Sequence, residues 1–176
     1  MNETIEMRNE LLDRLVEEFH EAYIAAAVAE IDDPEAPKIV RALLHEVGDS
    51  DGVMGEYFFT PMSSEEDPIQ VFNAILTLSE DIPEDNLPAL FEAMSYINYH
   101  IPVGAFSLNM EHTFFCFKMS VTIPMGYDKD VIYGLMSAAA GNSASIVDLY
   151  MQPLMDVAND KISVKEIKEI VSIRRQ

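Results

Sequence analysis

Hydrophobic side chains recur every three or four positions along residues 3–31, which predicts a long amphipathic helix. Acidic side chains fill most of the opposite face, and the apolar stripe comprises Leu12, Leu15, Val16, Phe19, Tyr23, Ala26 and Ala27. Residues 22–29 are apolar nearly all round, so this half of the helix needs cover on more than one side. We expect the helix to end at Asp32-Asp33-Pro34, because proline disfavours the helical conformation in the residue before it.

The pattern then changes to the period of strands. Three short segments are rich in β-branched and aromatic residues: Ile39–Glu46, Val53–Thr60 and Ile69–Leu78. The first two are joined by Gly-Asp-Ser-Asp-Gly at 48–52, and the last two by an acidic loop framed by prolines at 61–68. These features predict three antiparallel strands. Residues 37–47 also fit the helical period, so a helix remains the alternative for that segment.

Residues 83–157 repeat the alternation of helix and strands. An apolar stripe predicts a helix over Pro83–Asn98, a hairpin follows over Val103–Asn109 and Thr113–Thr122, and a long helical region covers about 129–157. We expect Asp128 or Asp130 to cap this last region, and Gly141-Asn142 and Pro153 to break or kink it. A short final helix begins at Ser163, with Glu166 completing a capping box.

The predicted order is therefore α-β-β-β-α-β-β-α, with a further short helix at the end. Its fold class is α+β, with an antiparallel sheet of about five strands and helices packed on the sheet. The 176 residues fit one domain, because a typical domain has roughly 100–200 residues.

The charge balance excludes some partners. The chain carries 31 acidic and 11 basic residues, a net charge of −20, so nucleic acid and anionic membrane surfaces should repel it. Residues 161–176 are net basic. This tail either complements a helix dipole or contacts the acidic body of a second subunit. The acidic N-terminus does not resemble a signal peptide and no apolar run is long enough to span a membrane, so we expect a cytoplasmic protein.

A set of turn and packing residues resembles a known family. The stretch Ile82–Pro88, then Asn98, Pro102, Gly104 and Phe106, and finally a strand ending in Ile123-Pro-Met-Gly126, is similar to the YbjN-like family. Those bacterial proteins are described as sensory-transduction regulators, and their fold is similar to that of type III secretion chaperones. The resemblance implies one small domain over 1–176 that pairs as a homodimer, without established catalysis.

The four motif residues have structural interpretations. Asn98 can cap the end of its helix. Gly104 permits a close approach where a strand begins, and Phe106 packs in the core. Pro102 helps to close the segment after the helix.

Patterns that would support catalysis or metal binding are missing from the sequence. His20, His45, His100 and His112 are spread over separate regions, and no paired-cysteine or His-Glu-x-x-His motif occurs. Cys116 lies in a predicted strand, where a structural thiol is the expected role. We therefore predict no catalytic residue, no metal and no cofactor.

The favoured hypothesis is a non-enzymatic protein-interaction or chaperone-like adapter domain that binds a protein partner and forms a homodimer. Its candidate interface residues, which offer more apolar surface than one sheet face readily covers, are Phe19, Tyr23, Leu90, Met94 and Ile97. The alternative is a hydrolase or metal-dependent enzyme whose site is assembled from scattered carboxylates and histidines.

Overall fold

In the computed structural model, the residues described are 3–29, 37–45, 47, 52–64, 67–79, 82–109 and 114–173. The helices are α1 (Glu3–Glu21), a 3-10 turn (Glu84–Asn86), α2 (Leu87–His100), α3 (Lys129–Ala158) and α4 (Val164–Ile173). The strands are β1 (Ala25–Val28), β2 (Ile39–Leu44), β3 (Val53–Pro61), β4 (Ile69–Ser79), β5 (Ala105–Asn109) and β6 (Phe114–Pro124). The predicted α+β class with an antiparallel sheet is confirmed.

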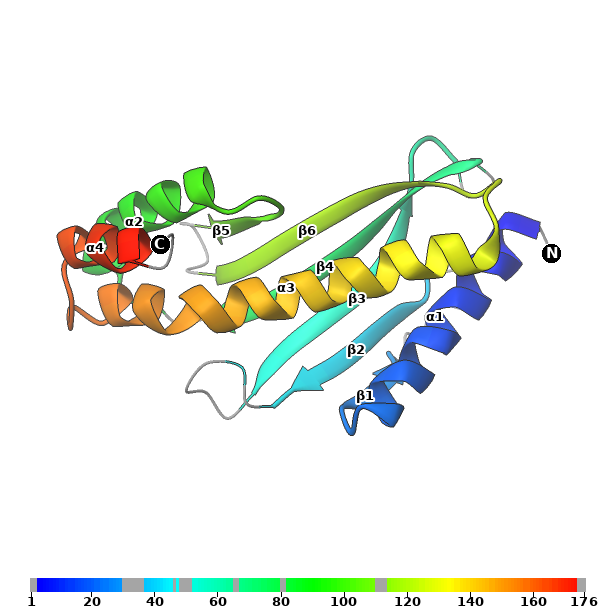
Figure 1. The fold of residues 1–176 in the computed structure, drawn as a ribbon, viewed down its shortest axis with the longest axis horizontal. Helices are drawn as coiled ribbons and strands as arrows, with labels where there is room; N and C mark the ends of the chain where they lie inside the picture. The colour runs from blue at the N-terminus through cyan, green and yellow to red at the C-terminus, as the bar shows by residue number, and fades with distance from the viewer. Residues whose placement is uncertain are drawn as a thin grey trace.

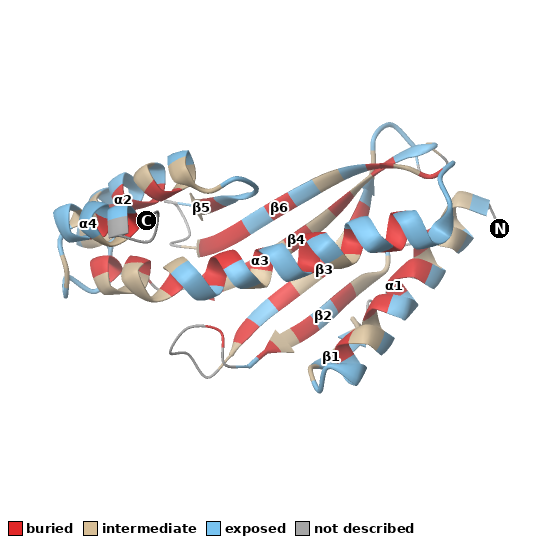
Figure 2. Ribbon diagram, in the orientation of Figure 1, coloured by how far each residue is buried: buried red, intermediate tan, exposed pale blue. Residues whose placement is uncertain are grey.

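The six strands form one antiparallel sheet in the order β1-β2-β3-β4-β6-β5. Figure 1 shows α3 lying across this sheet, α1 beside β1 and β2, and α2 with α4 at the far end of α3. Buried and less buried residues alternate along β3 and β4, as expected for strands with one face in the core. Figure 2 shows the corresponding alternation of buried bands along the strands. Helices α1 and α3 contact the sheet on the face that carries Tyr57 and Phe72, α2 contacts β5, and α4 packs on α2 and α3.

The predicted helix over 3–31 is wrong beyond Glu21. The chain turns at Tyr23, whose φ of 60° is left-handed, and Ala25–Val28 form an edge strand paired with residues 40–43. Ala25–Ala27 favour helix intrinsically, but pairing with β2 outweighs that preference. This strand makes the sheet six-stranded instead of about five-stranded. The proposed stop at Asp32-Asp33-Pro34 falls outside the described residues.

Several element boundaries agree with the sequence. Ile39–Leu44 is a strand, so the helical alternative for 37–47 is wrong. Most of the expected hairpin connection at 48–52 lies outside the described residues. The Asp128 side chain caps α3 by accepting a hydrogen bond from the Asp130 N–H.

Two expectations for the C-terminal helices have opposite outcomes. Of the break or kink expected at Gly141-Asn142 and Pro153, the break is wrong, because α3 runs through these residues for 30 residues. The kink stays a prediction. Buried side chains on both sides of the glycine, among them Met136 and Val147, hold the helix to the sheet. The capping box is confirmed. The N–H and hydroxyl of Ser163 donate to Glu166 at 2.8 and 2.7 Å, and these hydrogen bonds lower the pKa of the Glu166 carboxyl.

Candidate protein interface

Asn98 fastens β5 to α2. Its side-chain nitrogen donates to the Phe106 carbonyl at 2.9 Å, and its oxygen accepts from the Phe106 N–H at 2.8 Å. The predicted role as a helix cap is wrong, since the backbone N–H of Ile101 caps α2 by bonding to the carbonyl of Ile97. Asn98 instead satisfies both backbone groups of one residue on an edge strand.

Gly104 and Phe106 are closely packed beside the hydrogen bonds of Asn98. Gly104 has a φ of +69°, and a Cβ at this position would overlap the Phe117 ring and lie 2.9 Å from the Lys118 carbonyl oxygen. Phe106 is 2% exposed, and its ring centroid lies 5.0 Å from that of Phe117. The predicted roles of close approach and packing are confirmed. Pro102 follows extended Ile101 just after α2 ends, where proline is compatible with the end of the helix.

The predicted interface residues are mostly covered by this chain itself. Leu90, Met94 and Ile97 are buried in the core beneath α2, and Phe19 is buried with its ring centroid 5.2 Å from that of Tyr57. Tyr23 alone of the five is exposed. These four buried side chains leave no surface for a partner, so the apolar excess seen in the sequence is largely absorbed by the core.

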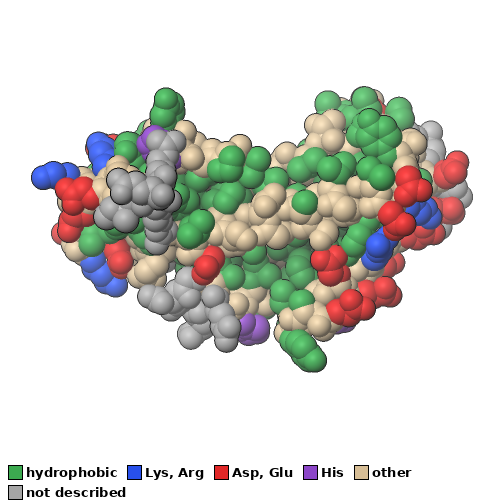
Figure 3. Space-filling view, in the orientation of Figure 1, with side chains coloured by type: hydrophobic (Ala, Val, Ile, Leu, Met, Phe, Trp, Pro, Cys, Tyr) green, Lys and Arg blue, Asp and Glu red, His purple; other side chains and the backbone are tan. Residues whose placement is uncertain are grey.

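A different apolar surface runs along the outward side of α3. We call it the α3 ridge, and its residues are Val131, Gly134, Leu135, Ala138, Gly141, Asn142, Ser145 and Leu149. Val131, Leu135 and Leu149 are 54%, 38% and 46% exposed. No charged residue occurs between Asp130 and Asp148. Figure 3 shows the middle of this face with mostly uncharged side chains and the charged ones gathered mainly toward the two ends.

The ends of the ridge differ in charge. Beside its N-terminal end, α1 presents an acidic group that includes Glu17 and Glu21. Beyond its C-terminal end, α4 presents Lys165 and Lys168, and Lys168 pairs with Glu92 at 3.1 Å. The ridge therefore joins a mainly acidic end to an end that carries lysines.

Tyr133 and Glu18 attach α1 to α3 next to the ridge. The Tyr133 hydroxyl and the Ser137 hydroxyl both donate to the Glu18 carboxylate. The Arg14 guanidinium carbon lies 3.8 Å from the centroid of the Tyr133 ring. Burial, followed by the hydrogen bond to Glu18, raises the pKa of Tyr133 above its ordinary value. Tyr133 therefore remains a neutral hydrogen-bond donor at neutral pH.

The sheet face opposite Tyr57 also carries partly exposed apolar side chains. On neighbouring strands these are Leu43, Met54, Phe58, Val71 and Ile75. Met54 is 40% exposed, and the face is crossed by an ion pair between Arg41 and Glu56 at 2.9 Å. Antiparallel sheets commonly have one solvated face, and the neighbouring apolar side chains on this one make it a candidate surface for a partner.

The residues considered for catalysis lie apart. The His20 ring contacts the Ala26 carbonyl at 2.8 Å, and the His100 ring packs edge-on against Tyr96 and Tyr99. Cys116 is 1% exposed, and burial raises the pKa of its thiol. Among the described residues, no group of three or more His, Cys, Asp or Glu side chains is placed to hold a metal ion. His112 lies outside these residues.

None of the helices in the described part of the chain combines the length and the apolar character needed to cross a membrane. Comparison of the chain with models of known protein families and with curated protein sequences gave no match.

Proposed function

We propose that this chain is a non-enzymatic protein-interaction domain, a chaperone-like adapter that acts in the cytoplasm as a homodimer. One observation carries the proposal: the exposed side of a 30-residue helix lacks charge from Val131 to Val147 in a chain with a net charge of −20. An uncharged face is the place where two strongly acidic subunits meet with the least repulsion.

The ridge suits antiparallel packing against its copy around a twofold axis near Asn142. The α3 ridge carries residues with little or no side chain: Gly134, Ala138 and Gly141. The axes of the two packed helices can therefore approach to about 8 Å, the lower end of the usual range of interaxial distances. In this arrangement the lysines of α4 lie toward the acidic end of the partner subunit. The same patch then serves both subunits, as a twofold interface requires.

Such a dimer leaves the sheet face opposite Tyr57 free for a second protein. Its apolar side chains, Met54 and Phe58 among them, and the acidity of the whole chain favour an apolar segment that also carries Lys or Arg. The resemblance of the motif residues to the YbjN-like family, whose fold is similar to that of secretion chaperones, supports this assignment by analogy.

Sedimentation velocity tests the homodimer. The wild-type chain of 19.8 kDa should sediment as a species of twice that mass, and salt should leave it intact because the contact is apolar. Leu135→Glu places a charge on each side of the contact and should give monomers. Val103→Glu is the matched control, because Val103 and Leu135 are both 38% exposed and Val103 lies off the ridge. A wild-type monomer at all concentrations, or a dimeric Leu135→Glu variant, would contradict the proposal.

An array of synthetic peptides tests the partner chemistry. The wild-type chain should retain peptides that combine apolar residues with Lys or Arg, and not acidic peptides of equal hydropathy. Phe58→Ser should reduce this binding, whereas Tyr127→Ser, at an exposed position off that face, should not. Equal binding of acidic and basic peptides, or no effect of Phe58→Ser, would contradict the assignment of this face.

A further inference from the structure

An apolar cavity of about 220 Å³ lies between α1, α3 and the β1 end of the sheet. Its walls include Leu15, Phe19, Ile24 and Leu44, and small residues of α3 line the side nearest solvent. An apolar cavity of about 150 Å³ is large enough to hold benzene, so this space can admit a single substituted ring or a short branched chain.

The Tyr57 hydroxyl is the unusual group in this cavity. Tyr57 is 0% exposed, and its hydroxyl has no hydrogen-bond partner among the described residues. A buried hydroxyl without a partner costs free energy, and native proteins rarely leave one in that state. The cost is explained if the partner is a ligand that binds there.

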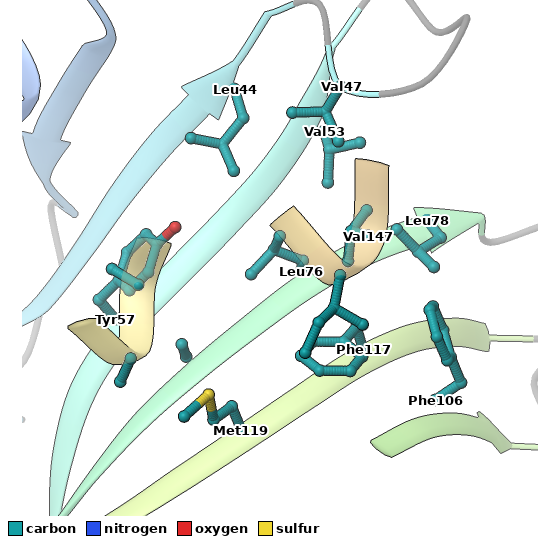
Figure 4. Packing of buried hydrophobic residues seen from close by; sticks show 14 of the residues in the cluster. Leu44, Val47, Val53, Tyr57, Leu76, Leu78, Phe106, Phe117, Met119 and Val147 are labelled. Atoms are coloured by element: carbon teal, nitrogen blue, oxygen red, sulfur yellow. The ribbon is translucent and has the colours of Figure 1, made fainter. Parts of the chain in front are cut away.

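The position of the Tyr57 ring directs the hydroxyl toward the cavity. The ring lies along β3 over Gly55, where a Cβ would be 2.7 Å from the hydroxyl oxygen. This direction leads toward the end of β2 that carries Leu44, which lines the cavity. Figure 4 shows the hydroxyl end of Tyr57 turned toward the Leu44 side. Any side chain at position 55 would displace the ring, so Gly55 is part of the arrangement.

The lining also limits the charge of the ligand. Its polar members besides Tyr57 are Glu18 and Ser137, and Ser137 already donates to Glu18 at 2.8 Å. A buried water typically makes about two to four hydrogen bonds, and the apolar walls beside Tyr57 supply few partners for one. The carboxylate at the rim disfavours anions. The site therefore suits a neutral molecule.

From these observations we propose that the cavity is a binding site for a small, neutral, mainly apolar molecule with one hydrogen-bond acceptor, and that the Tyr57 hydroxyl donates to this acceptor. This site is distinct from the two proposed protein-binding surfaces. Its walls are the sides of α1 and α3 that face the sheet, whereas the α3 ridge is the outward side of α3. Gly141 is the residue where the two meet, at the mouth of the cavity.

NMR titration of the full chain with acetophenone, and with cumene as its apolar counterpart of similar shape, tests the assignment. Both should bind the wild-type chain with saturation and shift resonances of residues around Tyr57. Tyr57→Phe should weaken acetophenone by about fivefold, the value of one ordinary hydrogen bond, and leave cumene within about twofold. If Tyr57→Phe lowers the affinity for both ligands equally, or lowers neither, the proposed hydrogen bond from Tyr57 is contradicted.

Two further variants separate the cavity from the α3 ridge. Gly141→Leu should fill the mouth and abolish binding of both ligands. Gly134→Leu is the control, because both glycines are exposed on α3 and a Cβ at either has no neighbour within 4 Å. Loss of binding in both variants would overturn the assignment, and so would failure of the wild-type chain to bind either probe. Both glycines also lie on the α3 ridge, so sedimentation of each variant is measured beside the titration, and the comparison of binding is made between variants in the same oligomeric state.

Discussion

The two ends of the sheet are packed in different ways. At the β5 end, Asn98 satisfies both backbone groups of Phe106, and Gly104 lies so close to Phe117 that no side chain fits. At the β1 end, a cavity of about 220 Å³ remains, and in the described part of the chain the Tyr57 hydroxyl has no hydrogen-bond partner. A pocket of about 280 Å³ also lies at the β5 end, between α2 and β5. The contrast is therefore between two positions: the backbone groups of Phe106 are satisfied by Asn98, whereas the Tyr57 hydroxyl is an unused donor.

This difference separates a position whose buried polar groups are paired within the chain from one whose hydroxyl is left for the proposed ligand. Dense packing with satisfied polar groups gives one low-energy arrangement. Open space beside an unpaired polar group lowers stability unless something fills it. Substitutions at matched positions in the two ends should therefore have unequal or opposite effects on the free energy of unfolding.

The largest expected contrast is between two glycines. Gly104→Ala should lower the free energy of unfolding by about 3 kcal/mol or more, because the alanine is strained at φ +69° and its Cβ overlaps Phe117. Gly141→Ala should raise it by up to about 1 kcal/mol, because alanine favours helix and the space there is open. Urea unfolding of both variants measures the two changes in the free energy of unfolding. Equal effects would show that the two positions do not differ in packing.

The second contrast is between two asparagines. Asn98→Ala should cost about 2 kcal/mol, because the N–H and carbonyl of Phe106 both lose their partner. Asn142→Ala, on the exposed ridge, should change stability by less than about 0.5 kcal/mol. Urea unfolding should also show that Asn98→Asp does not rescue the loss, since a carboxylate cannot donate to the carbonyl. Full stability of Asn98→Asp would contradict the double hydrogen bond.

Alkaline pH should weaken the protein through Tyr57 and Tyr133. Burial raises the pKa of each phenol in the folded state, whereas in the unfolded chain it lies at about 10. The stabilisation is therefore complete below about pH 10 and decreases as pH rises above it, by at most about 1.4 kcal/mol per pH unit for each phenol. Urea unfolding between roughly pH 9 and 11 measures how the free energy of unfolding changes with pH, and this change should be smaller in Tyr57→Phe than in the wild-type chain. An unchanged slope would place Tyr57 in contact with water.

The last contrast differs in sign and removes the same hydroxyl from each tyrosine at neutral pH. Tyr57→Phe should raise the free energy of unfolding by about 1 kcal/mol, because it removes a buried hydroxyl that has no partner. Tyr133→Phe should lower it by about 1–2 kcal/mol, because Glu18 loses a donor. Thermal and urea unfolding show whether each substitution raises or lowers the free energy of unfolding. Destabilisation by Tyr57→Phe in the absence of ligand would mean that its hydroxyl already has a partner.

The sequence predicted most elements because their apolar periodicity follows burial directly. The strands β2 to β6 and the capping box at Ser163 are examples. It failed at Ala25–Val28, where pairing with β2 decides between helix and strand, and such pairing is not visible in local composition. The role of Asn98 was missed for the same reason, since Phe106 comes close only after the chain has folded.

The candidate surfaces were harder to predict than the fold. Leu90, Met94 and Ile97 form an apolar stripe, but a stripe does not show whether this chain or another covers it. The α3 ridge did leave a signal, the absence of charge between Asp130 and Asp148, which becomes informative once the burial of each position is known. The unpaired Tyr57 hydroxyl left no signal, because it depends on Gly55 and on the spacing of two helices.

Cysteine cross-linking across the proposed twofold axis tests the dimer most directly. Cys116 is buried, so a new cysteine on α3 would be the reactive one in the described part of the chain. Asn142→Cys lies next to the helix midpoint, so the two copies should meet and form a disulfide-linked dimer in mild oxidant. In Val131→Cys the two copies should be separated by roughly 35 Å along the antiparallel helices and should not cross-link. Efficient linkage of Val131→Cys with none for Asn142→Cys, or linkage of neither, would contradict self-association through the α3 ridge.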